Sequence, residues 1–179
     1  MSDTIQKTDI EGVLLIDRPI LQDDRGFFHE TFRKNELEEL TGKPFEIVQQ
    51  NHSRSKRFTL RGIHVAPWSK LIYVTRGRVQ EIVVDLRKSS PTFGKWISFS
   101  LGEDTKSAIF LPPGCGNAFL VTSEEADYTY LVSDYWTPNS EYGLIWNDPD
   151  LNIKWQTESP ELSEKDQKNI TFKEKFSGR

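Results

Sequence analysis

Short stretches in which apolar and polar residues alternate, or which are apolar throughout, follow one another along most of the chain. The clearest is Val79–Leu86, where Gln80, Ile82, Val84 and Leu86 share one face and the intervening residues share the other. A period of two indicates a β-strand. The same criterion predicts further strands at Gly12–Ile16, Gly26–Phe32, Phe45–Gln49, Leu60–Val65, Leu71–Thr75, Trp96–Leu101, Ala108–Leu111, Ala118–Thr122 and Tyr128–Ser133.

Turn signals separate these strands at short intervals, for example at Arg76–Arg78 and Pro112–Gly114. Helical signals are few. One or two turns are expected at Asn35–Leu40, and a short helix at Glu164–Asn169 with Ser163 as its N-cap. Many short strands at this spacing predict an all-β fold, an antiparallel jelly roll with a few short peripheral helices.

No internal repeat, linker or low-complexity tract divides the 179 residues, so we expect a single domain over 1–179, with 1–10 and 170–179 as peripheral tails. No apolar run approaches the roughly 20 residues of a membrane span. Met1–Lys7 is polar, which predicts no secretory signal. Cys115 is the only cysteine. No intrachain disulfide can therefore form, and a cytoplasmic location is expected.

The net charge of −4 argues against nucleic-acid binding. The charge is unevenly spread, because Ile47–Gln80 contains no Asp or Glu. This segment is either a local anion site, such as one for a diphosphate, or a solvated face balanced by carboxylates from elsewhere. Its basic residues are Arg54, Lys56, Arg57, Arg61, Lys70, Arg76 and Arg78.

Metal and nucleophilic chemistry find little support in the sequence. The three histidines, His29, His52 and His64, form no His-x-His pair and have no neighbouring cysteine, so we predict no metal site and no cofactor. Cys115 lies between glycines with no histidine near it in sequence, which favours a small buried residue over a nucleophile. No phosphate-binding glycine loop is present.

Acid–base chemistry remains, and His64 is the best candidate because imidazole titrates near neutral pH. The segment Leu60–His64 also carries Arg61, and Lys70 follows on the next predicted strand. Strict alternation places Arg61 and His64 on opposite faces of their strand. Both can reach one site only if the strand bulges, and Gly62 is the expected position of that bulge.

At these residues the sequence resembles the dTDP-4-dehydrorhamnose 3,5-epimerase family. The likeness extends from Gly12 to about Asp166, and it depends on the order and spacing of several blocks rather than on any one of them. The blocks are Asp24–Phe28 with Glu30, Gln49–Ser55, Leu60–His64, Val84–Arg87, Ser90–Gly94, Trp146–Leu151 and Leu162–Asp166.

The resemblance implies a metal-free, cupin-like jelly roll that works as a homodimer on a nucleotide-diphosphate sugar. It implies that His64 is the catalytic base and Tyr130 the opposing acid. By the same resemblance Asp166 orients the base, and Lys70 is the cation beside the developing enolate. Even a C–H next to a ketone is only weakly acidic. Its proton can be removed by a positioned base if a positive group stabilises the enolate oxygen.

The resemblance also implies a set of substrate contacts. Trp136 matches an aromatic that stacks on the nucleotide base. Residues that match other nucleotide-sugar contacts are Arg25, Glu30, Gln49, Asn51, Arg61, Glu141 and Lys165. Simpler interpretations stay open: Tyr130 as an ordinary strand aromatic, Trp136 as core packing, Lys165 and Asp166 as a helix surface. Arg61 could instead pair with Asp85 or Glu81.

Two features depart from the family pattern. Asn117 stands where the family usually has a histidine, and it can hydrogen-bond a substrate but cannot titrate. The segment Val65–Ser69 is several residues shorter than the usual loop. Both features resemble a branch that acts on GDP-linked 4-keto-heptoses for bacterial capsule synthesis, and we expect that branch, with inversion at C3 or at C3 and C5. The alternatives are a dTDP-4-dehydrorhamnose 3,5-epimerase, a 3,4-ketoisomerase and a non-catalytic sugar-binding protein.

Overall fold

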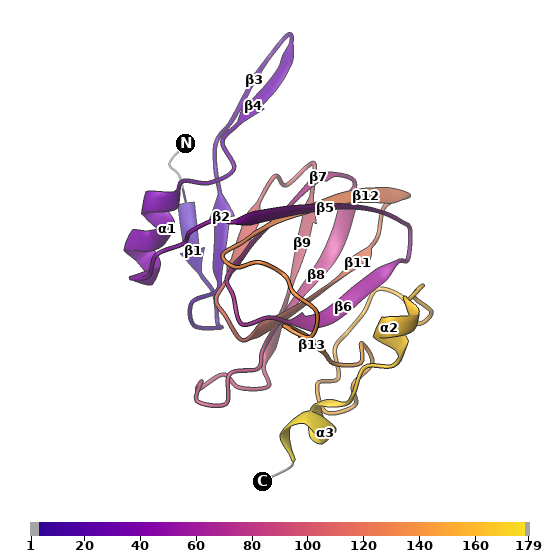
Figure 1. Cartoon of the computed structure of the whole chain (residues 1–179). Helices are drawn as coiled ribbons and strands as arrows, with labels where there is room; N and C mark the ends of the chain where they lie inside the picture. Colours follow the sequence, from indigo (N-terminus) through magenta and orange to yellow (C-terminus); the bar gives the residue numbers. More distant parts are fainter. Residues whose placement is uncertain (1–3, 178–179) are drawn as a thin grey trace.

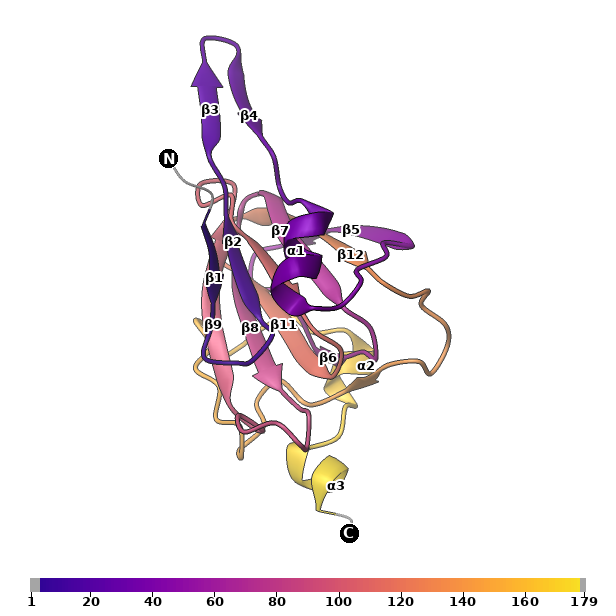
Figure 2. The ribbon, with the colours of Figure 1, turned by 90° about the vertical axis from the view of Figure 1, so that its left-hand side faces the viewer.

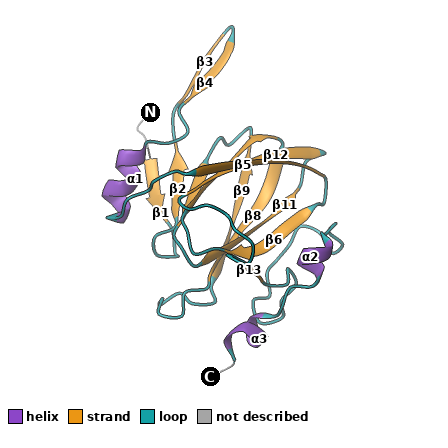
Figure 3. Ribbon diagram, viewed as in Figure 1, coloured by secondary structure: helices purple, strands orange, loops and turns teal. Residues whose placement is uncertain are grey.

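Two antiparallel sheets pack against each other to form the body of this computed structural model, which describes residues 4–177 (Figures 1 and 3). The first sheet has the strand order β1-β2-β10-β7-β12-β5 and the second β13-β6-β11-β8-β9, while β3 and β4 form a separate hairpin. The predicted all-β, cupin-like jelly roll is therefore confirmed. The strands are β1 (Thr4–Lys7), β2 (Leu14–Asp17), β3 (Ile20–Asp23), β4 (Gly26–His29), β5 (Gln49–Lys56), β6 (Leu60–Val65), β7 (Lys70–Arg76), β8 (Arg78–Asp85), β9 (Trp96–Gly102), β10 (Ala108–Leu111), β11 (Cys115–Val121), β12 (Glu125–Val132) and β13 (Tyr142–Gly143).

The strand β8, which lies between β11 and β9, is buried on both faces. Val79 and Val83 belong to the core between the sheets, with Ile72 of β7. Ile82 and Val84 face the other way and are covered by the chain after β13, which contributes Leu144, Leu151, Ile153, Trp155, Phe172 and Phe176. Each such large apolar side chain gains about 1.5–3 kcal/mol on burial. The C-terminal part of the chain is thereby fixed along the five-stranded sheet (Figure 1).

Each of the three short helices in the described part of the chain has a capping residue at one of its ends. Helix α1 (Lys34–Thr41) ends at Gly42, whose φ of 66° suits a residue without a side chain. Helix α2 (Glu164–Gln167) begins as predicted at Ser163, whose hydroxyl accepts a hydrogen bond from the Asp166 backbone. Helix α3 (Phe172–Phe176) has a full capping box between Thr171 and Glu174. It was not predicted, and part of the expected C-terminal tail is thus helical.

The predicted strand Phe45–Gln49 is wrong. Phe45 is buried against Phe110 at 5.2 Å, but it lies in an irregular segment. The strand β5 begins only at Gln49 and has the polar sequence QQNHSRSK. It is the edge strand of its sheet, so it carries almost no apolar signal.

The hairpin β3–β4 projects away from the body of the molecule (Figure 2). Its strand β4 ends at His29, earlier than the predicted Phe32. Leu21, Phe27 and Phe28 on this hairpin are 62–67% exposed. The aromatic run that predicted this strand therefore lies on an exposed hairpin and not in the core.

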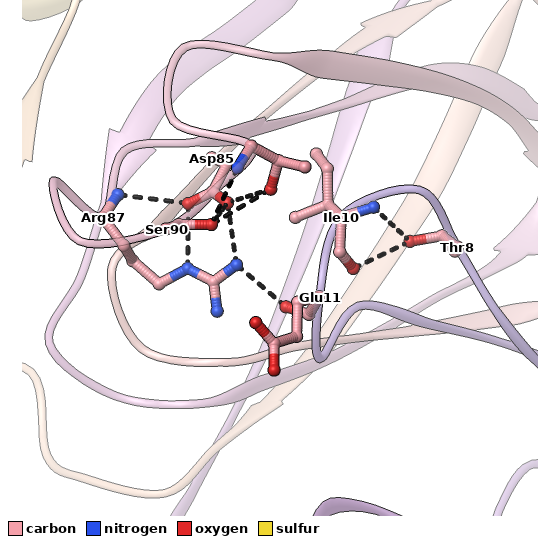
Figure 4. A network of polar contacts seen from close by, with 7 residues as sticks. Thr8, Ile10, Glu11, Asp85, Arg87 and Ser90 are labelled. Atoms are coloured by element: carbon pink, nitrogen blue, oxygen red, sulfur yellow. Dashed lines mark hydrogen bonds and ion pairs between the residues drawn. The ribbon is translucent and has the colours of Figure 1, made fainter.

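The fully buried carboxylate of Asp85 organises the loop between β8 and β9 (Figure 4). It accepts hydrogen bonds from Arg87 at 2.8 Å and from the hydroxyls of Ser90 and Thr92. Arg87 in turn donates to the Glu11 carbonyl at 2.8 Å, which ties this loop to the turn before β2. Burial raises the pKa of Asp85, but the hydrogen bonds from Arg87, Ser90 and Thr92 outweigh it and lower the pKa to about 2.

A carboxylate whose pKa falls on folding contributes stability above its unfolded pKa of 3.8, and this stability is lost as pH falls through about 2. Asp85→Asn should therefore reduce the free energy of unfolding by roughly 2 kcal/mol at pH 7. The difference from the wild type should narrow as the pH is lowered towards the folded pKa. Urea unfolding at several pH values measures it, and a difference independent of pH would contradict this role for the charge.

Candidate active site

A cavity of about 460 Å³ opens between the two sheets. Nine residues predicted from the sequence lie on its wall: Gln49, Asn51, Arg61, His64, Lys70, Asn117, Tyr130, Trp136 and Glu141. Because β6 and β11 belong to one sheet and β5, β7 and β12 to the other, the residues on these strands reach the cavity from two sides. The topology thus brings together residues that are up to 92 positions apart, from Gln49 to Glu141.

The predicted bulge at Gly62 is confirmed. Arg61 lies opposite Phe119 and His64 opposite Asn117, so β6 has two residues between these pairs and β11 has one. The extra residue lets both Arg61 and His64 line the cavity. Gly62 has a φ of 133°, and a Cβ there would lie 2.3 Å from the Ala118 Cβ. Only glycine fits at this close approach of β6 and β11.

His64 forms a hydrogen-bonded pair with Asp166, since its Nε2 lies 2.7 Å from Oδ1. The Ser163 hydroxyl donates to the other carboxylate oxygen at 3.0 Å and also caps α2. Burial raises the pKa of Asp166, but hydrogen bonds from His64, Ser163 and the Gly62 backbone outweigh it and leave the pKa below its usual value. The carboxylate therefore stays charged, favours a proton on Nε2 and leaves Nδ1 as the basic nitrogen.

Tyr130 faces the same cavity from β12, in the opposite sheet to His64. Its ring is half-buried against Trp68, Ala66 and Val132. Burial is the main cause that raises its pKa, the nearby Glu141 adds to the rise, and Arg61 opposes it. The phenol therefore keeps its proton at neutral pH and can donate it.

Lys70 is buried and donates to the Asn117 side-chain oxygen at 2.9 Å. Burial lowers the pKa of Lys70, while the charges of Glu141 and Glu81 oppose the change. Asn117 also donates to Glu81, which was not assigned to the site from the sequence. Asn117, which stands where the family usually has a histidine, thus belongs to a hydrogen-bonded chain that leads from the cavity wall to Glu81.

Arg61 is free of the carboxylates proposed as its alternative partners. Its Nε donates to the Ser55 hydroxyl at 3.1 Å, whereas Asp85 bonds Arg87 and Glu81 bonds Asn117. No ion pair of Arg61 is found among the residues that the structure describes. Its guanidinium on the cavity wall can bind an anionic group.

Trp136 lies at the cavity wall with 49% of its surface exposed, so the core-packing alternative is wrong. Its backbone N–H donates to Gln49 at 3.1 Å, and Gln49 donates to Asn51 at 2.9 Å. Glu141 is paired with Lys165 at 3.1 Å. Lys165 does not line the cavity itself, and it contacts the site only through its pair with Glu141.

Arg25 and Glu30 lie outside the cavity of their own chain, contrary to a simple grouping of all candidates in one pocket. Arg25 is at the end of the β3–β4 hairpin with a side chain 90% exposed, and it pairs with Asp23. Glu30 pairs with Arg18 and with Arg33 at 2.8 Å. Sequence proximity to a motif could not show that the hairpin carries Arg25 away from the body. Glu30 follows the hairpin and remains at the body through Arg18, whose side chain is buried.

Several cavity residues were missed from the sequence: His52, Ser53, Trp68, Phe119, Tyr128 and Val132. Tyr128 could have been found, because it is two residues before Tyr130 and therefore on the same face of β12. Trp68 lies in the short segment before Lys70, where no periodicity applies.

Alternative chemistries find no support in residues 4–177. No group of three or more His, Cys, Asp or Glu side chains in this range could hold a metal ion. No helix in it is long and apolar enough to cross a membrane. Burial raises the pKa of the Cys115 thiol to about 12, which makes it a poor nucleophile at neutral pH.

The cavity geometry agrees with comparisons to known proteins. The sequence profile of a family described as dTDP-4-dehydrorhamnose 3,5-epimerase matches residues 7–174. The chain belongs to this family. Membership confirms the expected enzyme class, a nucleotide-sugar epimerase among the isomerases.

Family relatives share most of the chain. It is 41% identical over 167 residues to the dTDP-4-dehydrorhamnose 3,5-epimerase of Pseudomonas aeruginosa, covering 91% of this chain and 92% of that one. It is 38% identical to a dTDP-4-dehydrorhamnose 3-epimerase of Streptomyces niveus, covering 92% and 82%. The family thus includes enzymes named for one inverted centre as well as for two.

Solved structures show the same fold. The dTDP-6-deoxy-D-glucose-3,5-epimerase RmlC of Legionella pneumophila, in complex with dTDP-4-keto-L-rhamnose, superposes with a TM-score of 0.90 at 37% identity, covering 95% of this chain and 93% of that one. ChmJ, a 3′-monoepimerase of Streptomyces bikiniensis in complex with dTDP-quinovose, gives a TM-score of 0.89 at 34% identity, covering 95% and 89%.

The close approach of β6 and β11 at Gly62 predicts that any side chain there destabilises the protein strongly. Gly62→Ala should lower the free energy of unfolding by roughly 3 kcal/mol or more, because it adds a steric clash to an unfavourable φ. Gly26→Ala is the matched control, since Gly26 has a φ of 131° but no atom within 4 Å of its Cβ position, and it should cost about 1 kcal/mol. Equal losses in chemical denaturation would show that the clash contributes nothing.

Proposed function

We propose that this protein inverts C3 and C5 of a dTDP-linked 4-keto-6-deoxyhexose by removing and returning a proton beside the ketone. The observation that carries the proposal is the placement of His64, paired with Asp166, and Tyr130 on opposite sheets of one cavity. Inversion needs a base on one face of the sugar carbon and an acid on the other. The two residues meet this requirement.

In the proposed mechanism, His64 takes the proton through Nδ1, and Asp166 stabilises the imidazolium that forms. The ketone oxygen becomes an enolate oxygen, next to which we place the Lys70 ammonium. Tyr130 then returns a proton from the opposite face. This assignment is supported by the buried position of Lys70 on the cavity wall and by the raised pKa of Tyr130, which keeps the phenol protonated.

Substrate binding is assigned to the polar and basic residues around the cavity. Arg61 is proposed to bind the diphosphate, because its guanidinium lines the cavity without a carboxylate partner among the described residues. Trp136, half-exposed beside Gln49, is proposed to stack on the nucleotide base. Gln49, Asn51, Asn117 and Glu141 supply hydrogen bonds, and Lys165 holds Glu141 in place. Remote binding of the nucleotide orients the reacting sugar.

The comparisons correct the expected GDP-heptose branch in favour of the dTDP-linked alternative. The relatives above are named for dTDP-linked sugars, and two solved structures hold dTDP-sugar ligands. In this proposal, Asn117 and the short segment before Lys70 are variations of a pocket for a dTDP-linked sugar and do not indicate a different nucleotide. A role in capsule synthesis has no support in these comparisons and is not proposed.

Solvent deuterium tests the reaction directly. With a dTDP-linked 4-keto-6-deoxyglucose in D₂O, the wild type should incorporate deuterium at C3 and C5, followed by NMR and mass spectrometry. A GDP-linked 4-keto sugar should exchange far more slowly. His64→Asn should lower exchange by at least about 10²-fold while it keeps its affinity for dTDP. Tyr130→Phe should lower inversion more than exchange.

Each contrary outcome has a distinct meaning. Exchange at C3 alone identifies a single-centre epimerase, and migration of the ketone to C3 identifies a 3,4-ketoisomerase. Binding without exchange identifies a non-catalytic sugar-binding protein. Faster exchange with the GDP-linked sugar restores the heptose alternative. Full exchange by His64→Asn excludes His64 as the base.

We further propose that the enzyme works as a homodimer in which the β3–β4 hairpin of one copy reaches the cavity of the other. Arg25 and Glu30 match substrate contacts but lie outside the cavity of their own chain. The same hairpin exposes Leu21, Phe27 and Phe28, which need a partner surface. A second copy accounts for both observations.

Subunit complementation tests this arrangement. Arg25→Ala and His64→Asn should each be nearly inactive alone. After subunits are mixed by co-expression, one of the two sites in a mixed dimer regains both residues, so about a quarter of wild-type activity should return for random pairing. His64→Asn mixed with Lys70→Ala is the control and should regain nothing, because both residues line one cavity of one chain. No recovery in the first mixture would exclude a site shared between copies.

A further inference from the structure

Four side chains form a buried hydrogen-bonded chain that leads from the cavity wall to Glu81. Lys70 Nζ donates to Asn117 Oδ1 at 2.9 Å, and Asn117 Nδ2 donates to Glu81 Oε1 at 3.2 Å. The Tyr128 hydroxyl donates to Glu81 at 3.1 Å and accepts from Asn117 Nδ2 at 3.1 Å. Glu81 is completely buried, and the other three are at most 8% exposed. The family resemblance assigned no role to Glu81 or Tyr128.

The chain has a fixed direction. An ammonium group can only donate, so the Asn117 oxygen must face Lys70 and its amide nitrogen must face the other way. Glu81 provides the acceptor for that nitrogen. If the amide turned over, two donors would oppose each other at Lys70, and Glu81 would lose a hydrogen bond. Glu81 therefore sets the orientation of the group that holds the Lys70 ammonium.

When it is ionised, Glu81 also supplies a negative charge close to the buried Lys70 ammonium. Lys70 makes no ion pair with any described residue, and burial lowers its pKa, while the charges of Glu141 and Glu81 oppose this change. Besides Glu141, the titratable or charged groups that share its cavity are His52 of β5, Arg61 and His64 of β6, and Tyr128 and Tyr130 of β12. Glu141 and Glu81 are the groups whose charges favour a charged Lys70.

We propose that Glu81 is a positioning residue for the reaction: through Asn117 it holds the Lys70 ammonium charged and directed at the cavity, where the enolate oxygen forms. The inference rests on the proposed epimerase function. Asn117 suits this arrangement because its amide accepts from Lys70 and donates to Glu81 at once and, unlike histidine, cannot take up a proton. Glu81 acts through Asn117 and touches no substrate.

Glu81 carries its charge mainly in alkaline solution. Burial raises its pKa to about 8, although hydrogen bonds from Asn117 and Tyr128 and the charge of Lys70 oppose the rise. Below this pH the carboxyl is largely protonated, and above it the carboxylate supports Lys70 as a cation. The contribution of Glu81 to catalysis should therefore grow as the pH rises through about 8.

Glu81→Gln tests the proposal, since it removes the charge and keeps the shape. The variant should lose roughly 10- to 100-fold in kcat at about pH 9, as for other groups that orient a catalytic group, while KM and dTDP affinity change less than about threefold. The loss should be smaller at about pH 6.5, and the alkaline limb of the rate profile should move to lower pH. Glu125→Gln is the matched control and should behave as the wild type, because Glu125 lies on β12 and pairs with Arg76 away from the cavity.

Tyr128→Phe is the second variant. It tests the role of Glu81 if thermal melting shows that Glu81→Gln does not fold. It keeps the Glu81 charge and removes one hydrogen bond that lowers the Glu81 pKa. The kcat of Tyr128→Phe should fall less than that of Glu81→Gln. Because the pKa of Glu81 is higher in this variant, the part of the activity that depends on the charged carboxylate should appear at a higher pH. A folded Glu81→Gln with wild-type kcat, or with a loss equal at all pH values, overturns the proposal, as does an unchanged profile in Tyr128→Phe. Absence of deuterium exchange by the wild type would instead refute the proposed function.

Discussion

The close approach of β6 and β11 at Gly62 is the constraint on which the site depends. The two backbones come so near that a Cβ at Gly62 would overlap Ala118. The extra residue that β6 accommodates there changes the alternation of its side chains, so Arg61 and His64 both reach the cavity. A regular strand would direct one of them elsewhere. A backbone feature thus places Arg61 and His64 together on one wall of the cavity.

The second requirement is that groups on the two walls keep different protonation states in one small space. Asp166 stays charged because hydrogen bonds outweigh its burial, and Tyr130 stays protonated because burial and Glu141 raise its pKa. The position of Asp166 depends in turn on the chain after β13, whose apolar residues pack on the outer face of the five-stranded sheet. Packing far from the cavity therefore holds Asp166 beside His64.

Local patterns predicted those parts of the fold in which burial follows the period of the strand. Leu60–Val65 and Ala108–Leu111 were predicted with the bounds that the structure has. The strand β5 was predicted at the wrong position, because an edge strand that faces a polar cavity has no apolar face by which the sequence pattern could reveal it. The strand predicted at Gly26–Phe32 exists as β4, but the sequence did not show that its aromatic residues lie on an exposed hairpin. Strand pattern alone cannot tell a surface awaiting a partner from a core.

The site was predictable where a residue type has a specific chemistry, as for His64, or where the family likeness supplied a position, as for Asp166 and Tyr130. It was not predictable where a role depends on contacts between strands. Glu81 appeared in the sequence only as one position in an alternating strand, and its partners Asn117 and Tyr128 lie 36 and 47 residues away. Such a buried network is defined by topology, which no local pattern contains.

The central claim is that His64 removes the proton through Nδ1 while Tyr130 serves the opposite face. A crystal structure with a dTDP-linked sugar that lacks the 4-keto group, and so cannot react, tests it most directly. The account predicts that C3 lies about 3–3.5 Å from His64 Nδ1, with the Tyr130 hydroxyl on the other side of the ring. A sugar whose C3 faces neither residue, or has both on the same side, would contradict it.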